Sequence, residues 1–166
     1  LIVSVANVAP GLPAGTNASI NEGSRFTRSV SFADPGTDTW TATLDYGDGS
    51  PVLTLMGVTP GTPVALDHVY ANDGQYTVRL SVGDGDGGVG TQTFVVTAAN
   101  VAPTANAGPN MSVGEGTPVS LLAGASDAGV NDPLTIQWTV VASNGQVVPQ
   151  STGGTFEFIP LDNGVY

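Results

Sequence analysis

The chain of 166 residues contains one histidine, His68, and neither cysteine nor lysine. A histidine acts as a general base only where a nucleophile and an orienting group lie beside it. Thiol chemistry and Cys-type zinc sites are excluded by composition. We therefore expect a structural role for His68 and no catalytic activity. Carboxylate-only glycoside hydrolysis stays open in principle, although the acidic residues fall in predicted turns rather than in an aromatic-lined cleft.

Oxygen ligands are plentiful, because 14 Asp and Glu stand against 3 basic residues, which gives a formal net charge of −11. This charge opposes binding to nucleic acid and to anionic membranes, whereas it suits divalent cations such as calcium. Residues 83–88 (GDGDGG) resemble a calcium-binding nonapeptide repeat, but that motif occurs once. Val95 stands where an EF-hand has its twelfth-position Glu. We interpret residues 83–88 as a turn between two strands.

The sequence contains an internal repeat. The sequence ANVAP at residues 6–10 recurs at residues 99–103 (99 − 6 = 93), and EGS at residues 22–24 recurs as EGT at residues 115–117. The later landmarks keep their order while the loops between them change length. Such self-similarity indicates repeated structural units.

The repeat frame sets the expected domain boundaries. Residues 1–6 match the last strand of a preceding repeat, residues 7–99 form a first module, and residues 100–166 form a second one. The second module has no counterpart of residues 77–98, so we expect it to lack its last two strands.

Alternation of apolar and polar residues predicts strands at residues 40–46, 76–82 and 134–140. The dipeptides Asp48-Gly49 and Asn144-Gly145 predict two-residue hairpins. Short strands with frequent turns are typical of an all-β protein. We therefore expect immunoglobulin-like β-sandwich modules in tandem, the second of them truncated.

A tyrosine corner is predicted in each copy. Residues 72–76 (NDGQY) and residues 162–166 (DNGVY) share the spacing of this feature, in which the tyrosine hydroxyl bonds backbone a few residues upstream. We also expect Trp40 and Trp138, on the third strand of their copies, to be largely buried.

These motifs together resemble the polycystic kidney disease (PKD) domain. They are LDYGDGS at residues 44–50, HVY at residues 68–70, GQY at residues 74–76, DGDGG at residues 84–88 and APTANAG at residues 102–108. The second copy keeps Trp138 but has no GDG. The chain thus looks like tandem PKD domains of a bacterial secreted or surface protein.

The resemblance implies a non-catalytic extracellular spacer or adhesion module of a repeat array. Two alternatives stay open: a calcium-stiffened inter-domain module, and an accessory domain of a secreted hydrolase that binds polysaccharide or protein polymers. The expected partners are neighbouring repeats and extracellular protein or polysaccharide, with no nucleic acid and no membrane insertion. The expected location is secreted or at the cell surface.

Some PKD domains bind calcium near the domain start, and calcium is the one cofactor considered. In this sandwich the start of strand A, the B–C loop and the F–G loop share one pole. The first copy places there Asn7, Asp34, Asp38, Asp84 and Asp86, and the second copy places there Asn100, Asp127, Asn131 and Asp132. Glu22 and Asp73 fall at the opposite pole of the first copy, beside the linker. Such hard oxygen ligands suit calcium, and the alternative is a solvated acidic surface that keeps the array soluble.

Overall fold

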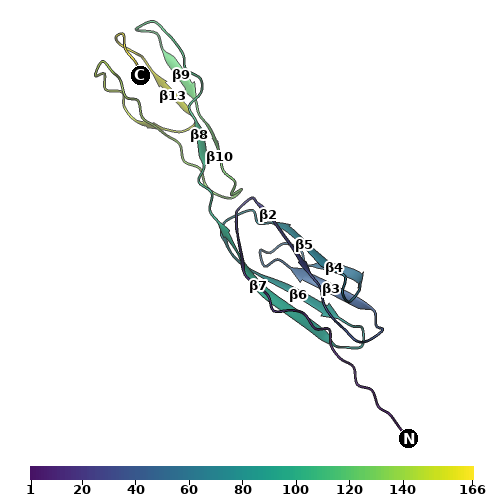
Figure 1. The fold of residues 1–166 in the computed structure, drawn as a ribbon. Coiled ribbons are helices and arrows are strands. Elements are labelled where there is room, and N and C mark those ends of the chain that lie inside the picture. The colour runs from purple at the N-terminus through teal and green to yellow at the C-terminus, as the bar shows by residue number, and fades with distance from the viewer. The chain divides into compact units, whose positions relative to one another are not determined.

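A computed structural model describes all 166 residues and divides them into two compact units, Leu1–Val101 and Ala102–Tyr166. We call these unit 1 and unit 2 and describe each by itself. Both are built from strands alone, as expected for an all-β chain (Figure 1).

Unit 1 is an immunoglobulin-like β-sandwich. Its strands are β1 (Ala18–Asn21), β2 (Arg25–Val30), β3 (Trp40–Asp45), β4 (Leu53–Val58), β5 (Val64–Val69), β6 (Gly74–Gly83) and β7 (Val89–Ala99). One sheet has the order β1-β7-β6-β3-β4 and the other pairs β2 with β5. β1 runs parallel to β7, and the remaining pairs are antiparallel. The predicted strands at residues 40–46 and 76–82 are confirmed as β3 and β6.

The core of unit 1 lies between its two sheets and follows the period-two pattern. In β6 the side chains of Val78, Leu80 and Val82 are fully buried, while Thr77 and Arg79 are exposed. Each such aliphatic side chain contributes about 1.5–3 kcal/mol to stability when it is removed from water. The core is continuous from β2 and β5 to β3, β6 and β7, so unit 1 is a closed sandwich.

The tyrosine corner of each copy is confirmed. The hydroxyl of Tyr76 donates to the backbone oxygens of Asn72 at 2.9 Å and Asp73 at 3.1 Å. The hydroxyl of Tyr166 lies 3.1 Å from the backbone oxygen of Asp162, in the same relation. These bonds fix the turn that precedes β6 in unit 1 and the corresponding turn in unit 2.

The two predicted two-residue hairpins are wrong. β3 and β4 are joined by residues 46–52, and β11 and β12 by residues 139–150. In the first loop the carboxylates of Asp45 and Asp48 accept hydrogen bonds from the backbone nitrogens of Gly47 and Ser50. These side-chain bonds form two consecutive turns, which need more residues than a tight hairpin.

The two tryptophans differ in burial. Trp138 is 7% exposed, stacks on Phe156 and donates from Nε1 to the backbone oxygen of Gly153 at 2.9 Å, as expected for a core residue. Trp40 is only half-buried, because a register shift between Trp40 and Thr41 places it at the edge of the core. Trp40 still packs against the core and against Phe32, so it is largely, although not fully, buried.

Unit 2 carries six short strands, β8 (Thr104–Asn106), β9 (Val119–Leu122), β10 (Gly124–Ser126), β11 (Gln137–Trp138), β12 (Ser151–Thr152) and β13 (Thr155–Phe158). They form three two-stranded sheets, β10-β8, β11-β12 and β13-β9. No strand of unit 2 is paired as β6 and β7 are in unit 1. Its buried apolar side chains are accordingly few: Val119, Trp138 and Phe156.

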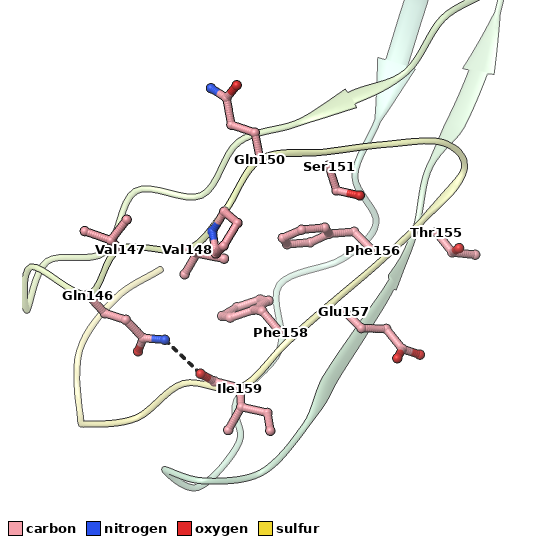
Figure 2. A pocket seen from close by; sticks show the side chains of 11 residues that line it. Gln146, Val147, Val148, Gln150, Ser151, Thr155, Phe156, Glu157, Phe158 and Ile159 are labelled. Carbon is pink, nitrogen blue, oxygen red and sulfur yellow. Dashed lines mark hydrogen bonds between the residues drawn. The ribbon is translucent and has the colours of Figure 1, made fainter.

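The rings of Phe156 and Phe158 stack at 5.7 Å and line a hollow of about 520 Å³ in unit 2 (Figure 2). Gln146 closes one end of this hollow, because its side-chain amide donates to the backbone oxygen of Ile159 at 2.9 Å. Unit 2 is thus held by local strand pairs and side-chain bonds rather than by a closed core.

Residues 1–6, expected to be the last strand of a preceding repeat, form no strand. They are exposed and belong to the first compact unit, Leu1–Val101, and the domain boundaries expected from the repeat stay a prediction. A single extended segment has no hydrogen-bonded partner of its own, which explains why the apolar pattern alone does not make a strand here.

Candidate functional site

Three segments of unit 1 meet at one end of the sandwich, as the sequence predicts. Asp34 and Asp38 lie in the loop between β2 and β3, and Asp84 and Asp86 lie in the turn between β6 and β7. Asn7 joins them, because its side-chain nitrogen donates to Oδ2 of Asp84 at 2.8 Å. We call this group of five residues the acidic pole.

Asp84 is the structural centre of the acidic pole. Its Oδ1 accepts hydrogen bonds from the backbone nitrogens of Asp86 and Gly88, each at 2.9 Å, and its Oδ2 accepts from Asn7. The bond from Asn7, together with these backbone donors, holds the pKa of Asp84 below its usual value. A side chain at position 88 would collide with this carboxylate. Both carboxylate oxygens of Asp84 are therefore used to hold the conformation of this turn, and binding a cation is at most their second role.

The other carboxylates of the acidic pole are less well compensated. Partial burial raises the pKa of Asp38, and the negative charges of Asp86, Asp34 and Asp84 raise it further. Oδ1 of Asp34 accepts a hydrogen bond from the backbone nitrogen of Gly36 at 2.8 Å, while its Oδ2 is buried without a hydrogen-bond partner. Accumulated negative charge and an unsatisfied carboxylate oxygen are features that a bound cation would relieve.

The second predicted ligand set comprises Asn100 in unit 1 and Asp127 and Asp132 in unit 2. Oδ1 of Asp127 accepts a hydrogen bond from the backbone nitrogen of Gly129 at 2.9 Å, which is the turn that Asp34 forms in unit 1. The backbone nitrogen of Asp132 donates to Gly129. Calcium ligation by this set stays a prediction.

Glu22 lies at the opposite end of unit 1 from the acidic pole. Its backbone nitrogen donates to Ala99 at 2.9 Å, and its Oε1 accepts from the backbone nitrogen of Val101 at 2.7 Å. The side chain is 1% exposed, and Oε2 is buried without a hydrogen-bond partner. Glu22 therefore anchors the chain where it leaves β7, whereas Asp73 contributes its backbone oxygen to the tyrosine corner.

His68 belongs to an aromatic stack. Its ring lies parallel to Tyr46 at 4.1 Å and edge-on to Tyr70 at 4.8 Å, and its Nε2 lies 2.7 Å from Oδ2 of Asp48. Burial acts to raise the pKa of Asp48, but hydrogen bonds from Ser50 and His68 outweigh it, so that pKa lies below its usual value. These contacts fit the structural role expected for His68.

Sequence reasoning missed one member of this stack. The hydroxyl of Tyr46 accepts from the backbone nitrogen of Asp67 at 2.7 Å and donates to its backbone oxygen at 3.0 Å. Tyr46 thereby bridges β5 to the end of β3, from one sheet to the other. The sequence signals were its core-phase position two residues beyond Leu44 and its place in the LDYGDGS motif at residues 44–50, neither of which shows the bond to Asp67.

Comparison with known proteins identifies the family to which the sequence is similar. The family model described as the PKD domain matches residues 7–98. Human polycystin-1 is 33% identical over 112 residues, which is 66% of this chain and 2% of that protein. The chain therefore spans a very small part of this relative.

Two solved structures are also similar. The PKD domain of an M14-like peptidase from Thermoplasmatales archaeon SCGC AB-540-F20 is 26% identical, with a TM-score of 0.42 over 56% of this chain and 98% of that chain. A structure of Dscam is 11% identical, with a TM-score of 0.38 over 96% of this chain and 40% of that chain.

Proposed function

This chain belongs to the PKD domain family, and on that premise we propose that it is a non-catalytic spacer or adhesion module of an extracellular repeat array. The observation that carries the proposal is the placement of the two ends of unit 1. The chain enters beside Asp84, at the start of the β6–β7 turn, and leaves beside Glu22, at the end of β7. Each module of this kind adds its full strand length to an array, on the order of 35 Å for the 11 residues of β7.

We further propose that unit 2 is a second, diverged module of the same kind. Two observations support this proposal. One is the repeat in the sequence, and the other is that repeat-equivalent residues pair in the same register within each unit. Phe26 pairs with His68 in β2-β5, and Val119 pairs with Phe158 in β9-β13. Likewise, Thr104 pairs with Ser126 where unit 1 has the bridge from Gly11 to Ala33.

An extracellular location follows from the family rather than from a targeting signal. The structure contains no helix that could span a membrane. Neighbouring repeats are the first partners that we propose, with extracellular protein or polysaccharide as further ones. Polymer binding through aromatic side chains is less favoured, because none of the 11 aromatic residues is fully exposed.

The spacer proposal is tested by the distance between the two ends of unit 1. The chain has no cysteine, so cysteines placed at Val8 and Ala99, both exposed, take spin labels selectively. Double electron–electron resonance should give a narrow distance distribution centred on the order of 35 Å. A broad distribution, or one centred well below this length, would contradict the spacer role. So would turnover of peptide or polysaccharide substrates by the purified chain.

Calcium binding at the acidic pole is the second candidate function. The raised pKa of Asp38 and the buried, unpartnered Oδ2 of Asp34 favour it. By repeat equivalence, the same proposal extends to Asn100, Asp127 and Asp132. Calcium would reduce carboxylate repulsion at these places and stiffen the array.

A further inference from the structure

Strand β4 is an open edge of the five-stranded sheet of unit 1. It pairs with β3 alone, so the backbone groups on its other side have no strand partner. Three apolar side chains along this edge are exposed: Val52 at 56%, Leu53 at 44% and Met56 at 80%. An exposed apolar edge of this kind is a template for pairing with a further strand.

The apolar core of unit 1 is incompletely covered at β4. Leu53 lies opposite Leu44 of β3, and cross-strand neighbours share one face of a sheet. Leu44 is 1% exposed, whereas Leu53 is 44% exposed and Leu55, the next residue on this face, is only partly buried. The facing sheet has two strands against five and cannot cover every strand of the larger one. Apolar side chains brought beside β4 would therefore add to stability.

The other three edges of the two sheets are protected. β1 is only four residues long, β2 carries Arg25 and Arg28, and β5 carries Asp67. Short edge strands and charged side chains both oppose pairing with another chain. No charged residue lies between Asp48 and Asp67, so β4 is the one edge of unit 1 that lacks such protection.

The sequence of this edge is complementary to itself in the antiparallel direction. In a register centred on Thr54, the opposed pairs of two copies are Val52 with Met56, Leu53 with Leu55, and Thr54 with Thr54. Every exposed apolar side chain of the edge then meets an apolar side chain on the same face. The bulge at Gly57, whose φ is 69°, begins only beyond these five residues.

Charge favours the same antiparallel contact between two copies. Because the net charge is −11, most surfaces of two copies repel each other. The register centred on Thr54 places Asp48 of one copy at the level of Pro60 of the other, in a turn without charge. A parallel arrangement would instead bring the two Asp48 carboxylates together.

We propose that unit 1 binds a second copy of this chain through β4, in antiparallel pairing about a two-fold axis at Thr54. The contact joins the two five-stranded sheets edge to edge, satisfies open backbone groups of both strands, and closes on itself as a dimer. Five residues from each copy make a small interface, which is typical of a weak and transient contact. The inference goes beyond the spacer role, which requires no contact between copies.

Sedimentation velocity of the full chain, from micromolar to millimolar concentration, is the first test. The average mass should rise towards that of a dimer. Thr54→Asp places two carboxylates directly opposite each other, so it should weaken dimerisation at least about tenfold. Thr77→Asp makes the same change at an exposed position of β6, in the middle of the same sheet, and should leave dimerisation unchanged. Both positions are exposed, and equal melting temperatures of the two variants would verify that neither change disturbs the fold.

A charge exchange at Thr54 tests the two-fold axis itself. Thr54→Lys alone should also weaken dimerisation, because two ammonium groups would face each other. An equal mixture of Thr54→Asp and Thr54→Lys should dimerise more strongly than either variant alone, since only this axis places the position opposite itself. For the same reason, Thr54→Cys should form a disulfide-linked dimer on mild oxidation, and Thr77→Cys should not.

Three outcomes would overturn the proposal: a chain that stays monomeric to millimolar concentration, undiminished dimerisation of Thr54→Asp, or a mixture of the Asp and Lys variants that associates no better than each alone. None of these outcomes bears on the distance between the ends of unit 1. The spacer proposal and this one can therefore fail separately.

Discussion

Oε1 of Glu22 accepts a hydrogen bond from the backbone nitrogen of Val101 at 2.7 Å, although 79 positions separate the two residues. The bond ties the turn between β1 and β2 to the chain just beyond β7. A buried carboxylate in this position substitutes for the backbone partner that Val101 would have inside a sheet. Glu22 therefore anchors Val101, the last residue of unit 1, to the turn between β1 and β2.

Replacing Glu22 with alanine should destabilise unit 1. The change leaves the nitrogen of Val101 without its acceptor, which costs about 1–3 kcal/mol of unfolding free energy when the group stays buried. Urea unfolding followed by Trp40 fluorescence, in a Trp138→Phe background, measures unit 1. Glu22→Gln keeps an oxygen acceptor and is the matched control. An equal loss in both variants would show that the hydrogen bond is not the cause.

Two tyrosine hydroxyls should differ in their contribution to stability. Tyr76→Phe removes a donor to two backbone oxygens near the surface, and we expect a loss of about 0.5–1.5 kcal/mol. Tyr46→Phe also removes the acceptor for the backbone nitrogen of Asp67, so its loss should be larger, about 1–3 kcal/mol. The same urea experiment ranks them, and a larger loss for Tyr76→Phe would contradict the assignment.

Local sequence signals predicted the strands of unit 1 and the tyrosine corners correctly, whereas the strand expected at residues 134–140 is present only as Gln137–Trp138. Period-two alternation reports which face of a strand is buried, and β6 follows it from Val78 to Val82. The corner depends on a turn and a tyrosine four residues apart, as in Asn72 and Tyr76. Both features are set by neighbours in the sequence, which explains why the sequence alone reveals them.

Contacts between distant segments were harder to predict. The loop after β3 is lengthened by the carboxylates of Asp45 and Asp48, the second of which is also bound by His68 from β5. The guanidinium of Arg28 lies 4.0 Å from the centre of the Phe94 ring on β7. Such contacts depend on how the sheets pack, and no spacing in the sequence encodes them.

The acidic pole was predicted in part. Topology correctly brought Asn7 to the turn that carries Asp84. That both oxygens of Asp84 are already hydrogen-bonded depends on the conformation of Gly85 and Gly87, which have φ angles of 84° and 100°. Composition suggests a ligand, whereas backbone conformation decides which carboxylates stay available.

Asp38→Asn should stabilise unit 1 at neutral pH without calcium. The pKa of Asp38 is raised above its ordinary value of 3.8, so ionisation of this group costs stability once the pH exceeds the folded pKa. The cost disappears below pH 3.8, where the group is protonated in both states. Thermal melting should therefore show an advantage of the variant at about pH 7 and none at about pH 3.

Asp45→Asn is the matched control for this pH effect, because it removes one carboxylate at the end of β3, outside the acidic pole. The control should not reproduce the pH-dependent advantage. An equal advantage of both variants at neutral pH would point to the overall net charge of −11 rather than to local repulsion.

Calcium should reverse the advantage of Asp38→Asn, because the carboxylate that repels its neighbours is also the ligand that a cation would use. Extracellular calcium modules bind with dissociation constants on the order of 10⁻⁴–10⁻³ M. At about 1 mM calcium the native chain should gain roughly 0.4–1.4 kcal/mol by mass action. Melting in calcium and in chelator measures this gain, and titration calorimetry measures the affinity.

Asp38→Asn should lose the gain in unit 1, Asp127→Ala should lose it at the second ligand set, and the exposed Glu157→Gln should keep both. If neither heat nor a melting shift appears in the native chain, the acidic pole is a solvated surface that keeps the array soluble.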